Sequence, residues 1–194
     1  MIKEFFTPQI KRYEKILHFC KGSVLLDFGS SEGDLHWYLK KNFRGRVTGI
    51  DLHNSDILHN LNVFPYPFEE NHADTIVAGE VIEHLLHPFK FLEECYRILK
   101  PDGVLIITTP NMIGLQHIVK PNNFWIKNRE DPHIYAWNIE MIQKLMEMAG
   151  FKVIHKELLN TFWSRNLLFR GICFFFKKIR PTIFIVGKKL ISSK

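Results

Sequence analysis

The chain has 194 residues, enough for one domain with a substantial core, and its 46% hydrophobic content is ordinary for a globular protein. Cys20, Cys95 and Cys173 are far apart and form no C-x-x-C pair, which argues against a disulfide framework or a zinc site. Residues 1–15 are mixed and charged and lack the apolar run of a signal peptide, so we expect a cytoplasmic protein. The net charge of +6 favours an anionic partner, either nucleic acid or lipid headgroups.

Residues 8–20 have apolar side chains at helical spacing and predict the first helix. The apolar run 24–26 then predicts a strand that is buried on both faces of a parallel sheet. Gly29 and Gly33 bracket a tight loop, and a second helical pattern begins at Asp34. Strand, glycine loop and helix in this order are typical of a nucleotide-binding α/β unit, because helix N-terminal amides point at the ligand.

A second apolar strand, residues 47–50, ends in Asp51, and a carboxylate about twenty residues after such a loop can bind ribose hydroxyls. The loop itself reads G-x-S-x-G, with Ser31 where a dinucleotide-binding loop carries a glycine. Three interpretations follow: a dehydrogenase loop, the nucleophile elbow of a serine hydrolase, or adenosyl binding without a pyrophosphate. An elbow normally follows several strands, whereas this loop follows the first one. A small residue at Ser31 does not hinder adenosyl binding, so that interpretation is favoured.

The segment 53–64 is polar and irregular and predicts almost no helix after the second strand. Residues 74–79 predict a central buried strand. Its carboxyl end should bring residues 78–80 to the crevice where ligands bind in open α/β sheets. Pro88 marks the start of an amphipathic helix.

The remaining pattern predicts a turn at 100–103, strands at 104–109, 151–158 and 182–187, and a helix at 138–148. Residues 112–136 mix aromatic and polar side chains without periodicity. Long loops at the carboxyl edge of a sheet often carry function, so we interpret this one as a substrate lip.

The motifs DFGSSEG and GIDLH resemble the first two motifs of class I S-adenosylmethionine-dependent methyltransferases. Four further matches follow in the order of that family, and together they span residues 20–190. The resemblance implies one α/β domain over 1–194. Its sheet would be Rossmann-like, seven-stranded and mostly parallel, with the last strand antiparallel and helices on both faces. It also implies that the helix within 1–20 lies over the cofactor cleft, although packing on the sheet edge would explain that helix equally well.

The same resemblance assigns roles to individual residues. Those around the methionine end of the cofactor would be Asp27, Gly29, Ser31 and Gly33, and Asp51 would bind the ribose. Asn60 and Leu61 would contact the adenine. Ala78 would leave room for the methionine half of the cofactor, and Glu80 would lie at the opening near the transferable methyl group.

An E-x-x-E-H run follows the central strand and contains the candidate catalytic residues Glu80 and His84. On a helix, Glu80, Glu83, His84 and His87 would share one face and suit Mg²⁺ or Mn²⁺. This run resembles the metal-binding one of ubiquinone-pathway O-methyltransferases and of small-RNA 2′-O-methyltransferases. The RNA enzymes add a later histidine, to which His133 partly corresponds as a ligand and catalytic residue. Alternatively, His84 only caps or packs the helix.

The segment 160–181, inserted before the last strand, interleaves aromatic and basic side chains over 162–180. It is too short and too charged to span a bilayer, but such a stretch can lie on an anionic membrane surface. A helix packed between the last two strands is the alternative. Basic aromatic segments also bind RNA, but no RNA-recognition motif is present.

These observations predict a methyltransferase that acts on an oxygen of a small-molecule, lipid or glycolipid acceptor. The alternatives are an RNA 2′-O-methyltransferase, a non-catalytic adenosylmethionine-binding protein and, more remotely, a serine hydrolase. The acceptor and the oligomeric state are not readable from the sequence.

Overall fold

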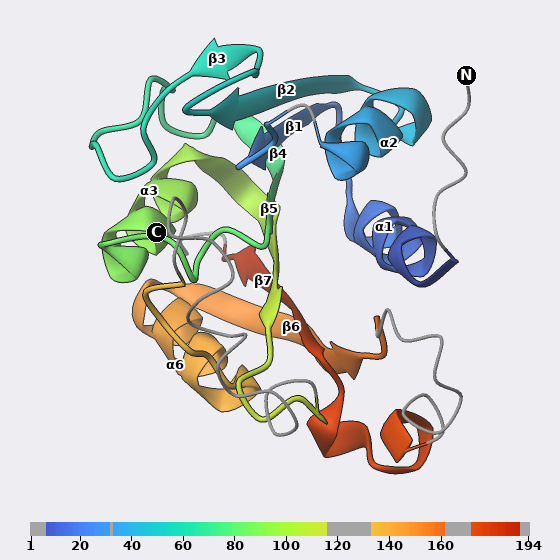
Figure 1. Ribbon diagram of the computed structural model, residues 1–194. Coiled ribbons are helices and arrows are strands. Elements are labelled where there is room, and N and C mark those ends of the chain that lie inside the picture. Colours follow the sequence, from blue (N-terminus) through green and yellow to red (C-terminus); the bar gives the residue numbers. More distant parts are fainter. Residues whose placement is uncertain (1–6, 32, 116–132, 162–171, 191–194) are drawn as a thin grey trace.

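The computed structural model describes residues 7–31, 33–115, 133–161 and 172–190 (Figure 1). Its elements are α1 (Thr7–Phe19), β1 (Val24–Phe28), α2 (Asp34–Asn42), β2 (Arg46–Asp51), β3 (Ile57–Leu58), β4 (Ala73–Gly79), α3 (Pro88–Ile98), β5 (Leu99–Pro110), α6 (Ile139–Met148), β6 (Phe151–Leu159), the 3₁₀ helix η1 (Lys177–Ile179) and β7 (Thr182–Lys189). Residues 1–6 at the N-terminus, 116–132 of the predicted lip and 162–171 of the basic aromatic segment lie outside the described residues.

The strands form one seven-stranded sheet in the order β3-β2-β1-β4-β5-β7-β6. The strands from β3 to β5 in this order pair in parallel, whereas β7 lies antiparallel between β5 and β6. The predicted Rossmann-like α/β fold with an antiparallel last strand is therefore confirmed. The strand order reverses between β1 and β4, and ligands of such sheets bind beyond the carboxyl ends of the strands at this reversal.

Neighbouring residues of each central strand are buried on opposite faces of the sheet. Leu26 and Ile76 belong to a core shared with α3 and α6. Leu25 and Val77 belong to a second core shared with α1 and α2. Figure 1 shows the two helix pairs on opposite sides of the sheet. Burial on both faces explains why the strands appear in the sequence as continuous apolar runs.

β5 begins earlier than the sequence predicted. Residues 100–103 were expected to form a turn before a strand starting at Val104. In the structure Ala73 of β4 already pairs with Leu99, and the register then shifts before Val104 pairs. Asp102 has φ +66°, a turn-like conformation. The four residues thus form an irregularity inside a longer strand, because β4 provides a partner on both sides of them.

No helix is assigned to residues 52–72, in agreement with the sequence prediction. In place of a helix, Tyr66 packs this connection against the sheet. Its side chain is 3% exposed, and its ring meets Phe28 edge-on at a centroid distance of 5.3 Å. Its hydroxyl donates to the Leu61 carbonyl oxygen (2.7 Å). An aromatic contact with β1 therefore holds this connection against the sheet.

Candidate active site

The glycine loop joins β1 to α2 at the carboxyl edge of the sheet. Gly29 has φ +78°, a left-handed conformation that favours glycine, and its N–H donates to the Ile50 carbonyl oxygen (2.8 Å). Gly33 is the N-cap of α2 and offers no side chain to the first N–H groups of that helix. Ser31 is exposed between them. The amides at the start of α2 are consequently the polar groups that this loop presents to a ligand.

A buried network that the sequence did not reveal lies beneath this loop. Asp27 Oδ2 lies 3.0 Å from His36 Nδ1, and the two side chains are only 3% and 4% exposed. His36 Nε2 lies 3.5 Å from Asp56 Oδ2. Burial raises the pKa of Asp27, while the hydrogen bond with His36 opposes that shift. The Asp27 carboxyl group is thus engaged by α2, and its predicted contact with the cofactor stays a prediction.

Gly49 allows this network to form. A Cβ atom at Gly49 would lie 2.5 Å from Ser30 Oγ and 2.8 Å from His36 Cε1. Ser30 Oγ also bonds to Ser55 Oγ (2.7 Å), which ties the glycine loop to the connection after β2. The Gly49 N–H donates to Asp56 Oδ2 (2.7 Å). The only available signal in the sequence was a histidine two residues into the second helix, on its buried face.

The residues predicted to bind the adenosyl group follow β2. Asp51 ends the strand, and its Oδ1 accepts a hydrogen bond from the Leu52 N–H (2.6 Å). Asn60 is exposed, and its side-chain oxygen accepts the Asn62 N–H (2.9 Å). Leu61 is 8% exposed and belongs to the core beside α3. All three lie at the carboxyl side of β2, but the Leu61 side chain is largely used for packing.

The ends of β4 and β5 meet at the same edge. Ala78 is fully buried in the core, and a Cβ atom on Gly79 would lie 2.9 Å from Leu35 Cδ2. Thr108 pairs with Gly79 across the sheet. The buried Thr108 hydroxyl has no hydrogen-bond partner among the described residues. Buried polar atoms are rarely left unpaired, and a polar group of a bound ligand would satisfy this one.

The prediction that the E-x-x-E-H run lies on one helix face is wrong. Residues 80–87 form turns between β4 and α3. Glu80 has φ +60°, which an α-helix does not accommodate, and α3 begins only at Pro88. His87 is exposed at the N-cap of α3 and does not join the other residues of the run. A proline disfavours helical backbone in the residue before it, which explains why the helix does not extend further back.

Glu80 is bound instead by the N-terminal helix. Arg12 Nη1 donates to Glu80 Oε1 at 2.8 Å, and the side chains are 11% and 34% exposed. This ion pair joins α1 to the carboxyl end of β4. It agrees with a helix beside the crevice, while coverage of a cofactor by that helix stays a prediction.

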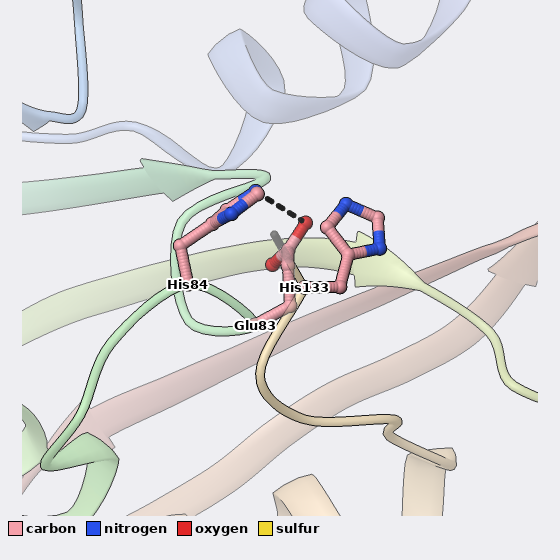
Figure 2. A group of neighbouring side chains, drawn as sticks. All are labelled: Glu83, His84 and His133. Carbon is pink, nitrogen blue, oxygen red and sulfur yellow. Dashed lines mark ion pairs between the residues drawn. The ribbon is translucent and has the colours of Figure 1, made fainter. Parts of the chain in front are cut away.

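Glu83, His84 and His133 lie together, although His133 is far away in sequence. One ligand atom from each lies within 4.8 Å of the others. His84 Nε2 is 3.8 Å from Glu83 Oε1, and the two imidazole rings have centroids 4.7 Å apart. Figure 2 shows Glu83 and His84 on the turn after β4 and His133 on the segment that leads to α6. The structure therefore brings together three of the side chains predicted to bind a metal, and it leaves Glu80 and His87 outside the group.

Backbone hydrogen bonds create this proximity. The N–H groups of Ile134 and Tyr135 donate to the Glu83 carbonyl oxygen at 2.8 and 3.1 Å. Thr109 Oγ1 donates to Glu83 Oε2 (2.8 Å), whereas Glu83 Oε1 accepts no hydrogen bond from the described residues. Burial, together with the charge of Glu80, raises the pKa of Glu83 well above its usual value. The group can hold a divalent cation or take a proton from a substrate.

The serine hydrolase interpretation requires a base beside Ser31. Within the described part of the chain Ser31 forms no hydrogen bond with a histidine, and His36 of the next helix is engaged by Asp27. The loop also follows the first strand of the sheet. The loop therefore lacks the pairing of nucleophile and base that defines the elbow.

Comparison with known proteins identifies the family. Residues 5–156 match the family model described as a methyltransferase domain. A Mycolicibacterium smegmatis protein named "Probable S-adenosylmethionine-dependent methyltransferase" is 29% identical over 170 residues, covering 80% of this chain and 61% of that protein. The demethylmenaquinone methyltransferase of Listeria monocytogenes is 29% identical over 126 residues, covering 59% of this chain and 52% of that enzyme. The chain thus spans about half to three fifths of the length of these curated relatives.

The fold is shared with solved structures. The crystal structure of an S-adenosylmethionine-dependent methyltransferase from Aquifex aeolicus matches with a TM-score of 0.63 at 18% identity, covering 95% of this chain and 90% of that one. At 18% identity this likeness shows only that the fold is shared. The family itself is shown by the family model, which matches residues 5–156. The chain therefore belongs to the class I S-adenosylmethionine-dependent methyltransferase family.

Proposed function

We propose that the protein transfers the methyl group of S-adenosylmethionine to an oxygen of a small, lipid-linked acceptor. The observation that carries this proposal is the Glu83, His84 and His133 group, which lies at the same edge of the sheet as the glycine loop. Methylation of oxygen needs a base or a cation, because a neutral hydroxyl is a weak nucleophile. The relative named demethylmenaquinone methyltransferase supports a lipid-linked acceptor.

The cofactor would lie across the carboxyl ends of β1, β2 and β4. Asp51 would accept hydrogen bonds from the ribose hydroxyls, and the glycine loop would surround the methionine portion. The unpaired Thr108 hydroxyl beside Gly79 supports a polar ligand group at this place. Glu80, held by Arg12, would border the opening near the methyl group.

The reaction is an in-line displacement. The acceptor oxygen forms a bond to the methyl carbon while the carbon–sulfur bond breaks. The electron pair of the broken bond stays on sulfur, which gives S-adenosylhomocysteine. The hydroxyl proton passes to the imidazole of His84 or His133. Glu83 lies beside His84 and would stabilise the resulting imidazolium. The enzyme otherwise aligns the reacting atoms and excludes water.

A divalent cation fits the same three residues. The group offers one carboxylate and two imidazoles, and Glu80 is not part of it because Arg12 binds that side chain. The buried Glu83 Oε1, which accepts no hydrogen bond from the described residues, is available as a ligand atom. Mg²⁺ prefers oxygen ligands, so this donor set favours Mn²⁺ over Mg²⁺. With a cation bound, the two imidazoles would be its ligands and would not take the proton. The cation would instead lower the pKa of the acceptor hydroxyl and orient it, so this is a second route beside the base mechanism.

The cofactor assignment is tested by Asp51→Ala. Losing charge-assisted hydrogen bonds to the ribose should weaken S-adenosylhomocysteine binding by about 10- to 100-fold, which corresponds to roughly 1.5–3 kcal/mol. Isothermal titration calorimetry measures the effect, with Glu93→Ala on the exposed side of α3 as the control. Equal affinity of Asp51→Ala and wild type would contradict the ribose assignment.

The acceptor assignment is tested with labelled S-adenosylmethionine. Polyprenyl-substituted phenols and catechols should become methylated. Loss of transfer after chelation and recovery with Mn²⁺ would favour the cation route, and transfer that chelation leaves unchanged would favour the imidazole base. Short RNAs with free 2′-hydroxyls serve as the competing acceptor class. Transfer to RNA alone would favour the nucleic-acid alternative. Tight cofactor binding with transfer to neither class would indicate a non-catalytic protein.

A further inference from the structure

Three adjacent aromatic side chains project from the segment before β7. Phe174, Phe175 and Phe176, here called the aromatic tip, are 67%, 78% and 65% exposed. The first two rings meet edge-on at a centroid distance of 5.4 Å. The preceding Cys173 is fully buried. The sequence left open whether the aromatic residues of this segment pack in the core, and these three do not.

Hydrogen bonds from Arg180 and Asn111 fix the backbone on both sides of the aromatic tip. Arg180 Nε donates to the Cys173 carbonyl oxygen (3.1 Å), and Arg180 Nη1 donates to the Leu158 carbonyl oxygen at the end of β6 (3.2 Å). Asn111 Nδ2 donates to the carbonyl oxygens of Arg180 (2.8 Å) and Lys178 (3.2 Å). A tip fixed in this way loses little conformational freedom when it binds a surface.

Asn111 also locates the tip relative to the candidate active site. It follows β5 directly, two residues after Thr109, whose hydroxyl donates to Glu83 (2.8 Å). The tip therefore lies at the carboxyl edge of the sheet, the edge that carries the Glu83 group. A surface that contacts the tip would lie on the side of the molecule where the acceptor enters.

Two exposed lysines follow the aromatic tip directly in the chain. Lys177 and Lys178 are exposed and form no ion pair with another described residue. Glu157 is the last acidic residue of the sequence. Of the basic residues that follow it, Lys177 and Lys178 come directly after the aromatic tip. Exposed aromatic rings next to exposed lysines complement the acyl boundary and the headgroups of an anionic bilayer.

We propose that the aromatic tip, with Lys177 and Lys178, docks this protein on an anionic lipid surface. The inference rests on the proposed function in one respect, since a lipid-linked acceptor would reside in that surface. No helix among the described residues is long and apolar enough to cross a bilayer, so the tip would rest in the interface. A second copy of the chain fits less well, because a two-fold contact at the tip would bring the lysines of both copies together.

Vesicle sedimentation of the full chain tests the proposal. Vesicles of phosphatidylcholine with phosphatidylserine should bind the protein, and vesicles of phosphatidylcholine alone should bind it at least about tenfold more weakly. Replacing Phe174, Phe175 and Phe176 together by Ser should lower partitioning by about tenfold or more. Combined Lys177→Glu and Lys178→Glu should have a similar effect, through charge and without changing the rings.

The matched control is Lys144→Glu combined with Met148→Ser on α6. Met148 is 61% exposed and lies at the end of α6 that leads into β6, away from the carboxyl edge. This variant should bind vesicles like the wild type. Titration with S-adenosylhomocysteine should give wild-type affinity for every variant and so shows that each has folded. If the serine variant fails that titration, the lysine variant decides the question.

The inference would be overturned by equal binding to both vesicle types, by unchanged binding of both tip variants, or by a dimer of the wild type that the serine variant abolishes. Salt-sensitive binding to RNA without vesicle binding would also overturn it, in favour of a nucleic-acid surface. Vesicle binding without methyl transfer would contradict the proposed function and leave the docking surface standing.

Discussion

In the part of the chain that the structure describes, two groups contain a buried carboxylate beside a histidine, and their surroundings differ. Asp27 and His36 are bonded at 3.0 Å, both almost fully buried, with Asp56 beyond the second imidazole nitrogen. Glu83 is as deeply buried, but one of its oxygens accepts no hydrogen bond from the described residues. Its neighbour His84 is 22% exposed at the edge of the sheet.

This difference separates a structural group from a chemical one. In the first group each member contacts another, and the contacts join β1, α2 and the connection after β2. Such a network stabilises the fold but has little capacity left for a ligand. In the second group one oxygen of the buried Glu83 accepts no hydrogen bond from the described residues, and both neighbouring imidazoles are partly exposed. Residue types alone do not distinguish the two, whereas hydrogen-bond partners and exposure do.

The largest effect on stability should come from His36→Leu. It removes the partner of Asp27 and leaves a buried carboxyl group unpaired, which should lower the free energy of unfolding by about 3 kcal/mol. Urea denaturation monitored by tryptophan fluorescence measures the loss. The control is Trp37→Ala, since Trp37 is the next residue and is 59% exposed. This substitution should change the free energy of unfolding by less than about 1 kcal/mol. Similar small losses for both variants would show that the network is not structural.

Glu83→Gln should reduce methyl transfer by about 100-fold, because the amide neither stabilises an imidazolium nor binds a cation as a carboxylate does. The affinity for S-adenosylhomocysteine should stay within about twofold of wild type, since this side chain lies outside the proposed cofactor contacts. Single-turnover kinetics and calorimetry separate the two quantities. Glu93→Gln on α3 is the control, and equal rates for both variants would remove Glu83 from the mechanism.

The smallest effect should come from Asp56→Asn. Although burial opposes its ionisation, hydrogen bonds from the Gly49 N–H and from Lys40 keep the pKa of Asp56 below its usual value. A carboxyl group with a lowered pKa stabilises the fold above its unfolded pKa of about 4 and loses this contribution as the pH falls through the folded value.

The Asn variant should therefore lose less stability than wild type when the pH drops below about 4. At neutral pH the difference should stay under about 1 kcal/mol, because the Asp56 side chain is 37% exposed and screened by water. Denaturation curves recorded at a series of pH values test this prediction. If the variant lost more stability than the wild type as the pH falls, the assigned direction of the pKa shift would be contradicted.

The sequence by itself determined the glycine loop and the strands and helix around it. Gly29, Gly33 and Asp51 are fixed by consecutive elements, so their spacing along the chain already specifies their spacing in the sheet. The apolar runs likewise specify strands buried on both faces, and Pro88 specifies the start of α3. These features depend on interactions between near neighbours in the chain, which a linear pattern records.

The tertiary structure decided which distant side chains come together and which aromatic side chains are exposed. The Glu83 and His133 contact depends on backbone hydrogen bonds between distant segments, and the same holds for the Arg12 and Glu80 ion pair. Helical spacing placed Glu80 with Glu83 only because it assumed a helix that φ +60° at Glu80 excludes. Exposure of the aromatic tip depends on which neighbours cover it. Composition cannot specify that, because identical phenylalanines serve equally well in a core and on a surface.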